Sequence, residues 1–567
     1  MVSCQSAPSG TAARANAPAP DRTLHEKSGN RFAVATQGVE SSRIGAEVLR
    51  KGGTVVDAAI AVTFAISVER PQSTGIGGGG FLIYYDAKKK RAYTLDFRDQ
   101  APGAATPAMF LDAKGNPNPG LSVKGGLAIA VPGLVEGMRT LHRAGFSRRP
   151  FEELVRPARE LAEKGVKVSP HLANAIETVK SDLIQDPLAK SRFFKGDGTP
   201  LKAGDLLVQP ELGAALARIG ASPRDFYEGG IAQDLLSTLK QAGSPVTATD
   251  LKSYRAKKRR ALEGEFSASG QKYRVISMPP PSSGGIHILQ FLKMMSALKM
   301  DEKPRYDAKT LHAMAQAFQQ VYADRAKFLG DPEFVKIPVK SLMSEAYLAS
   351  RLGEFNPSRA RTMNEVSAGS FPGFEKDDTT HFTIVDHEGN AVVSTQSVNG
   401  YFGSKIFARK SGFVLNNGMD DFSQKAGVLN QFGAVGSKKN LPEGGKRPLS
   451  SMSPTIVLHQ GKPVLALGCP NGTRIISGVA QVIFNRFFYG MDLYSAVSAP
   501  RIHHQWQPDQ LWLEEGVLTS TVQTTLEAMG YPIKPFKAQN FIQAVSLEDG
   551  RLTAVSDPRD VAGAQAE

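Results

Sequence analysis

Small hydroxyl, amide and acidic residues gather in the C-terminal third of the chain, and these are the residue types that could do chemistry here. A Thr pair opens the segment KDDTTHFTIVD at 376–386, and Ser397 and Asn399 stand at the end of the next predicted strand. Three more polar, glycine-rich segments follow: LNNGMDDFS at 415–423, KRPLSSMSPT at 446–455 and GCPNGTR at 468–474. A Thr pair alone would be unremarkable, because strands favour threonine. Four such clusters exceed what a simple core needs, and they predict a site.

Several common kinds of site are excluded. The run GIGGGGF at 75–81 lacks the Lys-Ser/Thr of a phosphate loop and the spacing of a dinucleotide fingerprint, so we interpret it as a tight turn with close backbone packing. No Gly-x-Ser-x-Gly motif is present. His503 and His504 are adjacent, which does not place two imidazoles on one metal from one helix face, so we expect structural roles. Two cysteines, Cys4 and Cys469, exclude a disulfide framework, a structural zinc cluster and a CxxC motif.

The composition is typical of a folded protein with a sizeable core. The chain has 567 residues, of which 41% are hydrophobic and 22% charged. The net charge of +14 is spread along the chain, with its densest run at 88–91, so no nucleic-acid partner is expected. The excess favours attraction of small anionic substrates, with a solvated surface as the alternative. The chain has no run of 18 apolar residues, so no transmembrane segment is predicted. Residues 55–68 are expected to form a buried helix.

The N-terminal segment has a different character. Residues 1–30 are rich in Ala, Pro, Ser and Gly without periodicity, and they are predicted to be a flexible leader. The pattern of a secretory signal is not present in them. The opening MVSCQS resembles the end of a bacterial lipoprotein signal, which would make Cys4 a lipidated residue; an ordinary cysteine is the alternative.

Antiparallel hairpins give the clearest structural signal. Four pairs of β-branched and aromatic runs flank turn sequences. They are 81–85 with 92–97, 381–385 with 391–398, 455–459 with 464–468, and 544–547 with 551–555. Several of these strands are apolar on both faces, which indicates that both faces are covered.

Helical segments alternate with the hairpins. Apolar residues at helical spacing predict a helix over 308–328, and residues 473–490 are apolar enough to be buried. Ser41 and Ser42 are expected to cap a helix that ends at Gly52–Gly53. This arrangement predicts an α+β protein with two stacked sheets between two helical layers.

The motifs taken in order resemble the γ-glutamyltranspeptidases, a family of the N-terminal nucleophile hydrolases. The resemblance covers the chain from about residue 30 to residue 563. The motifs are GGTVVDAAIA, ERPQSTGIGGGGF, LDFRDQAP, AVPGLVEGM, PPPSSGGIH, DDTTHF, NNGMDDFS, KRPLSSMSPT, APRIHHQW and SDPR. Each is weak alone, but the ordered set is specific, and it implies a four-layer α/β/β/α sandwich.

The resemblance implies a self-cleaving precursor, because members of this family cut themselves before a Thr. The matching bond is Asp378–Thr379, where Thr379 Oγ would attack the Asp378 carbonyl and water would resolve the ester. The implied products are a large chain of residues 1–378, in which 31–378 follow the leader as the large subunit of the sandwich, and a small subunit of residues 379–567. The two subunits would share one structural domain. Cleavage would free the Thr379 α-amino group, whose ordinary pKa of about 8 suits a general base. A Thr with its own amine needs no Ser-His-Asp triad.

The resemblance also implies catalytic partners for Thr379. Ser397 matches a hydroxyl, usually Thr, that hydrogen-bonds the nucleophile. The backbone N–H groups of Asn471 and Gly472 match the oxyanion hole. Members of the family usually have Gly-Gly there, so Asn471 is a departure that is tolerable if only its N–H is used.

Five further residues match contacts to the α-amino acid end of the substrate. Arg98 matches a clamp on the α-carboxylate, a task that suits a bidentate guanidinium. Ser450 and Ser451 match further contacts to that carboxylate. Asn399 and Asp421 match binders of the α-amino group, and Asp421 would supply the opposite charge.

Gly418 is the most serious departure from the family pattern. The family commonly has Gln or Glu at this place, where the side chain also contacts the substrate amine, so Gly418 puts glutamyl affinity or selectivity in question. Residues 426–436 match a lid loop over the pocket, with Phe432 at a usually aromatic position.

The function expected from this resemblance is that of a self-processing γ-glutamyltransferase and glutathione hydrolase. Its partners would be glutathione and related γ-glutamyl compounds, with water or an acceptor amino acid or peptide taking the acyl group. No metal and no organic cofactor are implied, and the periplasm or the outer surface is the expected location. The alternatives are a related acylase for poly-γ-glutamate or β-lactam side chains, and an uncleaved, inert glutamyl-binding protein.

Overall fold

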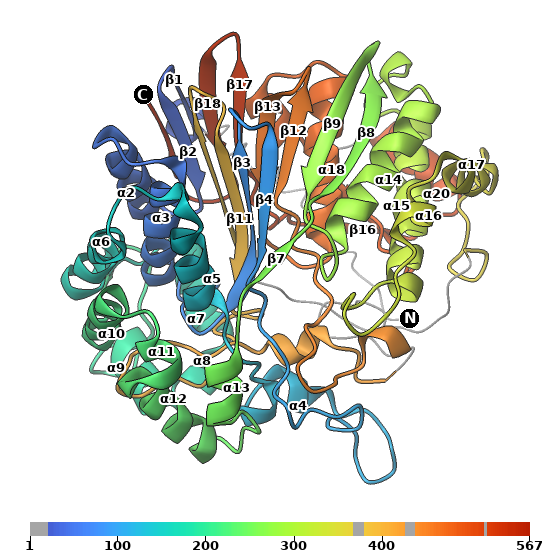
Figure 1. Ribbon diagram of the computed structural model, residues 1–567. Coiled ribbons are helices and arrows are strands. Elements are labelled where there is room, and N and C mark those ends of the chain that lie inside the picture. Colours follow the sequence, from blue (N-terminus) through green and yellow to red (C-terminus); the bar gives the residue numbers. More distant parts are fainter. Residues whose placement is uncertain (1–20, 367–378, 426–436, 515–518) are drawn as a thin grey trace, which may run out of the picture.

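Two seven-stranded sheets, in which all neighbouring strands are antiparallel, stack face to face (Figure 1). The computed structural model describes residues 21–366, 379–425, 437–514 and 519–567. The first sheet has the order β19-β2-β10-β11-β3-β4-β7, and the second has the order β1-β18-β17-β13-β12-β9-β8. The first consists of β2 (Phe32–Thr36), β3 (Gly79–Asp86), β4 (Arg91–Asp96), β7 (Lys257–Arg259), β10 (Thr380–Asp386), β11 (Ala391–Ser397) and β19 (Ala564–Ala566). The second consists of β1 (Glu26–Gly29), β8 (Leu262–Ala268), β9 (Gln271–Ser277), β12 (Thr455–His459), β13 (Lys462–Gly468), β17 (Gln543–Glu548) and β18 (Arg551–Ser556).

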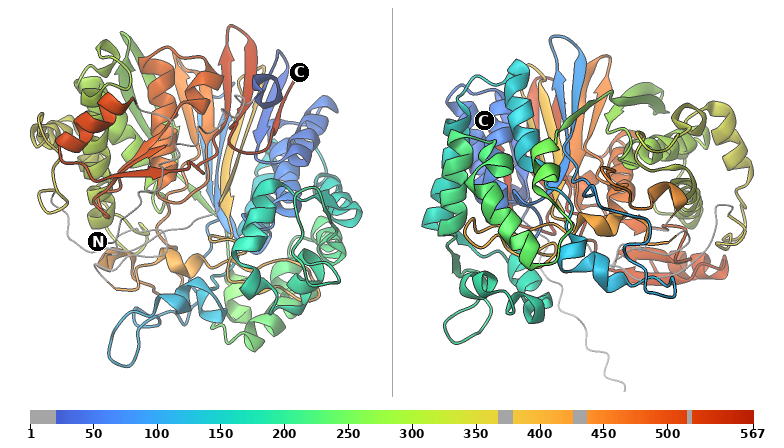
Figure 2. Two further views of the ribbon diagram at one scale, coloured as in Figure 1. Left: turned by 180° about the vertical axis from the view of Figure 1, so that it is seen from behind. Right: turned by 60° about the horizontal axis from the view of Figure 1, so that its bottom comes forward.

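Helices cover the outer face of each sheet, which completes four layers (Figure 2). On the first sheet lie α2 (Val39–Arg50), α3 (Val55–Glu69) and α5 (Leu134–Leu141), while α6 (Phe151–Lys164) packs on α3 and α10 (Pro210–Ala221) packs on α6. On the second lie α14 (Gly284–Ala297), α15 (Ala308–Phe328), α18 (Arg474–Phe488) and α19 (Leu493–Ser498). This is the predicted α/β/β/α sandwich.

Smaller elements surround the sandwich. The remaining helices include α1 (Arg22–His25), α4 (Pro119–Val123), α7 (Pro170–Thr178), α8 (Lys180–Leu183), α9 (Pro187–Phe193), α11 (Asp225–Glu228), α12 (Gly230–Gln241), α13 (Ala248–Ser253), α16 (Val339–Leu342), α17 (Glu345–Gly353) and α20 (Ser520–Ala528). Two small sheets consist of β5 (Val166–Lys167) with β6 (Leu206–Leu207), and of β14 (Ile502–His503), β15 (Leu511–Glu514) and β16 (Ile533–Phe536). No helix within the described residues is long and apolar enough to cross a membrane.

The side chains of β10 show how the layers divide the core. Phe382 and Ile384 are fully buried in the apolar cluster that includes α2 and α3. His381 and Thr383 point instead between the sheets, where the His381 ring hydrogen-bonds Thr383 on one side and Thr395 of β11 on the other. Burial lowers the pKa of His381 to about 3, so this ring is neutral at physiological pH.

The structure confirms the four predicted hairpins, which are β3–β4, β10–β11, β12–β13 and β17–β18. It also confirms the helix over 308–328, which is α15, and the two buried helices, which are α3 and α18. Asp57, which interrupts the apolar run of α3, belongs to its N-terminal capping box: Asp57 accepts the Thr54 N–H at 2.8 Å and donates its own to Thr54 at 3.1 Å.

Two predictions near the N-terminus are wrong. The helix for which Ser41 and Ser42 were the expected caps begins earlier, at Val39. Its first N–H groups are bound by a carboxylate from α3, because Glu69 accepts the N–H groups of Glu40 and Ser41. The prediction of a flexible leader over residues 1–30 is also wrong for its last part. Residues 26–29 form the edge strand β1, which pairs with β18, whereas residues 1–20 lie outside the described residues.

We predict that Gly468→Ala destabilises the sandwich. A Cβ at Gly468 would lie 2.3 Å from Cε1 of the His381 ring, which is held by two hydrogen bonds between the sheets. Overpacking of this kind costs about 1–3 kcal/mol. Gly353→Ala is the matched control, because Gly353 ends α17 with open space around it. Equal unfolding temperatures for the two variants would contradict the prediction.

Candidate active site

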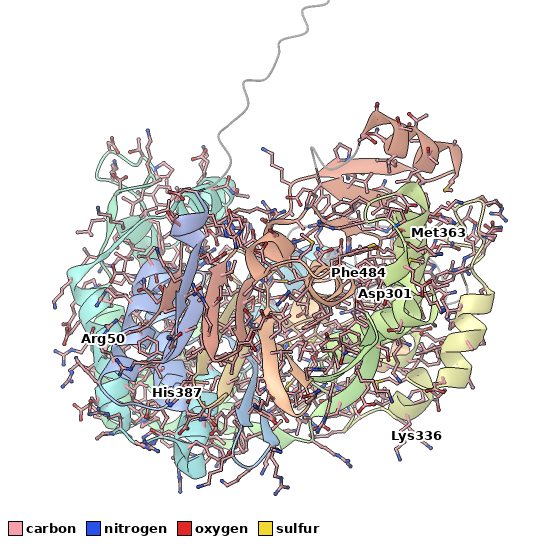
Figure 3. All side chains as sticks on the ribbon, turned by 90° about the horizontal axis from the view of Figure 1, so that it is seen from above. Arg50, Asp301, Lys336, Met363, His387 and Phe484 are labelled. Carbon is pink, nitrogen blue, oxygen red and sulfur yellow. The ribbon has the colours of Figure 1, made fainter. Side chains whose placement is uncertain are left out.

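Strand ends from both sheets meet at one end of the sandwich. Because β4 and β11 are each antiparallel to β3, both end at the same edge of the first sheet, which is also where β10 begins (Figure 1). The second sheet contributes the segments before β12 and after β13. The opposite end of the sandwich faces the viewer in Figure 3, where His387 of the β10–β11 turn is labelled.

Thr379 stands directly before β10 and is 6% exposed. Its Oγ1 lies 3.3 Å from Oγ of Ser397, the last residue of β11. The same Ser397 oxygen accepts the backbone N–H of Asn399 at 2.7 Å. The two hydroxyl groups predicted to act together are therefore neighbours, and the second is fixed by the backbone that follows its strand.

A run of asparagines folds the segment beside these hydroxyls. Asn399 has a positive φ of 81°, a conformation that Asn tolerates better than most residues, and its side-chain amide donates to the Asn417 carbonyl at 2.9 Å. Asn416 accepts the Gly418 N–H at 2.8 Å, and it also donates to the carbonyls of Gly77 and Ala130. These bonds place the short 3₁₀ helix η4 (Gly418–Asp421) against the end of the first sheet.

A buried guanidinium lies between two carboxylates in this region. Arg98, two residues beyond β4, is 1% exposed; its Nη1 donates to Asp99 Oδ1 at 2.9 Å, and its Nη2 pairs closely with Asp421. Burial raises the pKa of Asp421 to about 7, although Arg98 opposes that shift. The two carboxylates in turn raise the pKa of Arg98, against the effect of its burial.

Ser450 and Ser451 lie on the second-sheet side, in the segment before β12. Both hydroxyl oxygens already accept a hydrogen bond: Ser450 Oγ from the Met452 N–H at 3.1 Å, and Ser451 Oγ from Arg325 Nη2 at 3.1 Å. Each hydroxyl also has one proton to donate, and within the described ranges neither proton has an acceptor in the protein. The Ser283 N–H and hydroxyl hold the Ser450 carbonyl, at 2.7 and 2.8 Å.

Arg325 is a site residue that the sequence reasoning missed. It belongs to α15, is 7% exposed, and lines the same cavity as Thr379. A signal was available, because Arg325 follows Tyr322 by three positions and so places a charge on the apolar face of that helix.

Asn471 and Gly472 form the turn between β13 and α18, with positive φ angles of 90° and 43°. Their shared conformation explains why Gly-Gly suits this turn, and Asn is among the few other residues that accept it. Within the described residues neither backbone N–H has a hydrogen-bond acceptor. The Tyr322 hydroxyl donates to the Thr473 carbonyl, and the Thr473 hydroxyl donates to Gln505 at 2.6 Å, so the turn is held from behind.

One cavity joins these groups. Its lining includes almost all the predicted site residues that the structure describes, and adds four that were not predicted, among them Arg325 and Met452. The lining residues are Arg98, Arg325, Thr379, Ser397, Asn399, Asp421, Ser450, Ser451, Met452, Gly472, Thr473 and Ile475. Asn471 is adjacent to this wall, whereas Asp378 and the predicted lid at 426–436 with Phe432 lie outside the described residues. The free volume is about 20 Å³, room for one water molecule, so a larger ligand has to displace side chains.

The other motifs have structural roles. In the glycine run, a Cβ at Gly78 would lie 2.2 Å from the Ser397 carbonyl and one at Gly79 would lie 2.4 Å from the Asp99 nitrogen, which confirms close backbone packing. His503 is buried and bonds Ser477 and Gln505. Among the described residues no group of His, Cys, Asp and Glu is placed to hold a metal ion.

Comparison with known proteins gives long matches. The profile of one family, described as Gamma-glutamyltranspeptidase, matches residues 41–566. The chain is 40% identical over 530 residues to the "Glutathione hydrolase proenzyme" of Escherichia coli (strain K12), which covers 93% of this chain and 90% of that protein. It is 32% identical over 557 residues to the "Acylase ACY 1 proenzyme" of Pseudomonas sp. (strain SE83), which covers 95% of this chain and 96% of that protein.

Among solved structures, the cephalosporin acylase of Bacillus halodurans superposes with a TM-score of 0.83 over 98% of this chain and 99% of that chain. The sequence identity is 24%, so this similarity concerns the fold. It confirms the four-layer sandwich.

Proposed function

The chain belongs to the gamma-glutamyltranspeptidase family, and on this premise we propose that it is a self-cleaving γ-glutamyl hydrolase and transferase with Thr379 as its nucleophile. The observation that carries the proposal is the pairing of Thr379 with Ser397 in a cavity that also holds Arg98 and Asp421. A nucleophile that shares a cavity with a positive and a negative charge suits an acyl donor with a zwitterionic end.

Self-cleavage would come first. Thr379 Oγ attacks the carbonyl of Asp378, the peptide C–N bond breaks, and the Thr379 nitrogen takes up the proton to become a free amine. Water then hydrolyses the Asp378 ester. The products are a large subunit that ends at Asp378 and a small subunit of residues 379–567.

The mature site would then act on a γ-glutamyl amide such as glutathione. The Thr379 amine accepts the proton of the Thr379 hydroxyl as Oγ attacks the γ-carbonyl, and it returns that proton to the leaving amine. The N–H groups of Asn471 and Gly472 stabilise the oxyanion, and Ser397 holds the nucleophile by its hydroxyl. Water, or an acceptor amino acid or peptide, then takes the γ-glutamyl group from the Thr379 ester.

The α-amino acid end of the donor would exchange with the ion pair inside the cavity. Arg98 binds the α-carboxylate together with the free protons of Ser450 and Ser451. Asp421 and Asn399 bind the α-ammonium. Because Arg98 and Asp421 pair with each other in the structure, the incoming zwitterion replaces one pair by two.

A second candidate is an acylase of the same family, for a glutaryl-type β-lactam side chain or for poly-γ-glutamate. Gly418 supports it, because a residue without a side chain offers the substrate amine no contact, and the similarity to Acylase ACY 1 is consistent with it. Hydrolysis of γ-glutamyl anilide and glutaryl anilide would distinguish the candidates, since only the first carries an α-amino group. The contact between Thr379 and Ser397 weighs against an inert binding protein.

A location in the periplasm or on the outer surface is part of this proposal, and it rests on the family resemblance alone. Lipidation of Cys4 concerns a residue outside the described part of the chain.

We predict that Thr379→Ala abolishes self-cleavage, because it removes the attacking oxygen. The denatured intact mass of the wild type should show two fragments, residues 1–378 and 379–567, and that of the variant should show one uncut chain. Thr380→Ala is the control, because Thr380 is adjacent and buried, yet has no part in the proposed attack. Cleavage of Thr379→Ala, or a single chain for the wild type after long incubation, would refute the proposal.

We also predict that binding of L-glutamate as a competitive inhibitor strengthens as pH rises through 7. Asp421 has a raised pKa of about 7, so it is neutral below that pH and attracts the ammonium only above it. Arg98, Asp99, Asp420 and Arg325 are the charged groups that act on it. If only the ionised form binds, Ki falls about tenfold between pH 6 and pH 8.

Asp421→Asn should flatten this profile, and glutarate, which has no ammonium, should not follow it. A pH profile that is identical for L-glutamate and glutarate would rule out Asp421 as the ammonium partner.

A further inference from the structure

The space above Gly418 is occupied by the side chain of Asp99. A Cβ built on Gly418 would lie 1.5 Å from Asp99 Oδ2 and 2.6 Å from its Cγ. A side chain at position 418 and the present position of the Asp99 carboxylate therefore exclude each other. The absence of a side chain at position 418 therefore leaves room for the carboxylate of Asp99, which lies three residues beyond β4.

Asp99 is held rigidly where it lies. It is 1% exposed, and its Oδ1 accepts a hydrogen bond from Arg98 Nη1 at 2.9 Å. The backbone of Gly79 approaches the same oxygen so closely that a Cβ there would lie 2.9 Å from Oδ1. Its Oδ2 has no hydrogen-bond partner within the described part of the chain. Two glycines thus pack against this carboxylate, and among the described residues its hydrogen-bond partner is Arg98.

Asp421 differs from Asp99 in every respect that matters for exchange. Its side chain is 12% exposed and lines the cavity, whereas Asp99 lies behind Arg98 and outside the lining. Asp421 is also the last residue of the short helix η4. Arg98 therefore has one partner that a ligand can displace and one that it cannot reach.

We propose that Asp99 is the fixed counter-ion that positions Arg98 for the substrate carboxylate, and that Gly418 is the residue that makes room for it. This inference rests on the proposed function. When the substrate arrives, Asp421 moves from Arg98 to the ammonium, and Nη2 of Arg98 turns to the carboxylate. Asp99 keeps Nη1, so the guanidinium does not rotate away and is never buried without a carboxylate. Asp99 is thus a positioning residue that does not touch the substrate.

The test uses the mature, self-cleaved enzyme with Asp99→Asn, which keeps the shape and an acceptor oxygen but removes the charge. Competitive inhibition constants would be measured for L-glutamate, for glutarate, which lacks the ammonium, and for 4-aminobutyrate, which lacks the α-carboxylate. We expect Ki to rise about tenfold, the scale of a charge-assisted hydrogen bond, for L-glutamate and for glutarate, which both have a carboxylate for Arg98 to bind. The Ki of 4-aminobutyrate should change little. The same variant should raise KM for γ-glutamyl anilide more than it lowers kcat.

A matched control is Asp549→Asn, an exposed aspartate in the β17–β18 turn at the other end of the sandwich. It should leave all three inhibition constants unchanged. The proposal would be overturned if Asp99→Asn weakened the binding of all three ligands equally, weakened only the ligands that have an ammonium group, or weakened none of them.

Gly418→Ala tests the same idea without removing the charge. It replaces the first test if the Asp99→Asn variant does not cleave itself to the mature enzyme. Its methyl group should displace the Asp99 carboxylate and weaken L-glutamate and glutarate in the same way. In the Asp99→Ala background the space is free, so adding Gly418→Ala should cost nothing further. Additive losses in the double variant would mean that the two residues act independently, which refutes the inference.

Failure of the proposed function would look different. In that case the wild type itself would neither cleave γ-glutamyl anilide nor bind L-glutamate, whatever stands at position 99.

Discussion

The burial of Arg98 is the constraint on which the site depends. A guanidinium that is 1% exposed has lost its water, and such a charge is tolerated only with carboxylates in contact. The chain meets this need with Asp99 from the end of β4 and Asp421 from η4, which lie 322 positions apart along the chain. Both bind the same guanidinium, and the pair between Arg98 and Asp421 adds to the asparagine hydrogen bonds that hold η4 against the first sheet.

This charge cluster continues into the core behind the site. Asp96, the last residue of β4, is fully buried and pairs with Arg447 and Arg259, and it accepts the Arg98 N–H at 3.0 Å. Arg447 leads into the segment that carries Ser450, so the same carboxylate that orients the Arg98 backbone also anchors the second-sheet side. Removal of one charge from such a buried network leaves others unpaired, which is why single changes here are expected to act over several residues.

Much of the fold could be predicted from the sequence because its signals are local. Alternation and turn residues fix the four hairpins, and the spacing of apolar residues fixes α15 from end to end. The start of α2 could not be predicted from its serines, because its first turn is satisfied by Glu69, a carboxylate from another helix. The strand β1 was missed for a similar reason: its sequence has little strand character, and its pairing with β18 comes from the far end of the chain.

The site residues likewise divide into those that local motifs predict and one that depends on long-range packing. Motifs placed Thr379, Ser397 and Arg98 in one cavity, because each belongs to an ordered set of polar clusters. The packing of Asp99 could not be predicted from the motif LDFRDQAP that contains it, because it depends on how closely Gly79 of β3 and Gly418 of η4 approach this side chain. Gly418, which by sequence alone is a missing contact, is in the structure the space that a carboxylate fills.

Charge balance in the cavity argues for a zwitterionic ligand. Arg98 and Arg325 line the cavity with two positive charges. Two negative charges oppose them, ionised Asp421 in the lining and Asp99 behind Arg98, whereas Asp420 accepts the Ser122 hydroxyl. An α-amino acid end adds no net charge to this set, so it can enter without leaving an ion unpaired. A glutaryl group adds one negative charge, and a proton on Asp421 would restore the balance. The ratio of γ-glutamyl to glutaryl hydrolysis should therefore rise with pH. Ionised Asp421 binds the ammonium of the γ-glutamyl group, whereas the glutaryl group, which has no ammonium, is accommodated only when Asp421 is neutral.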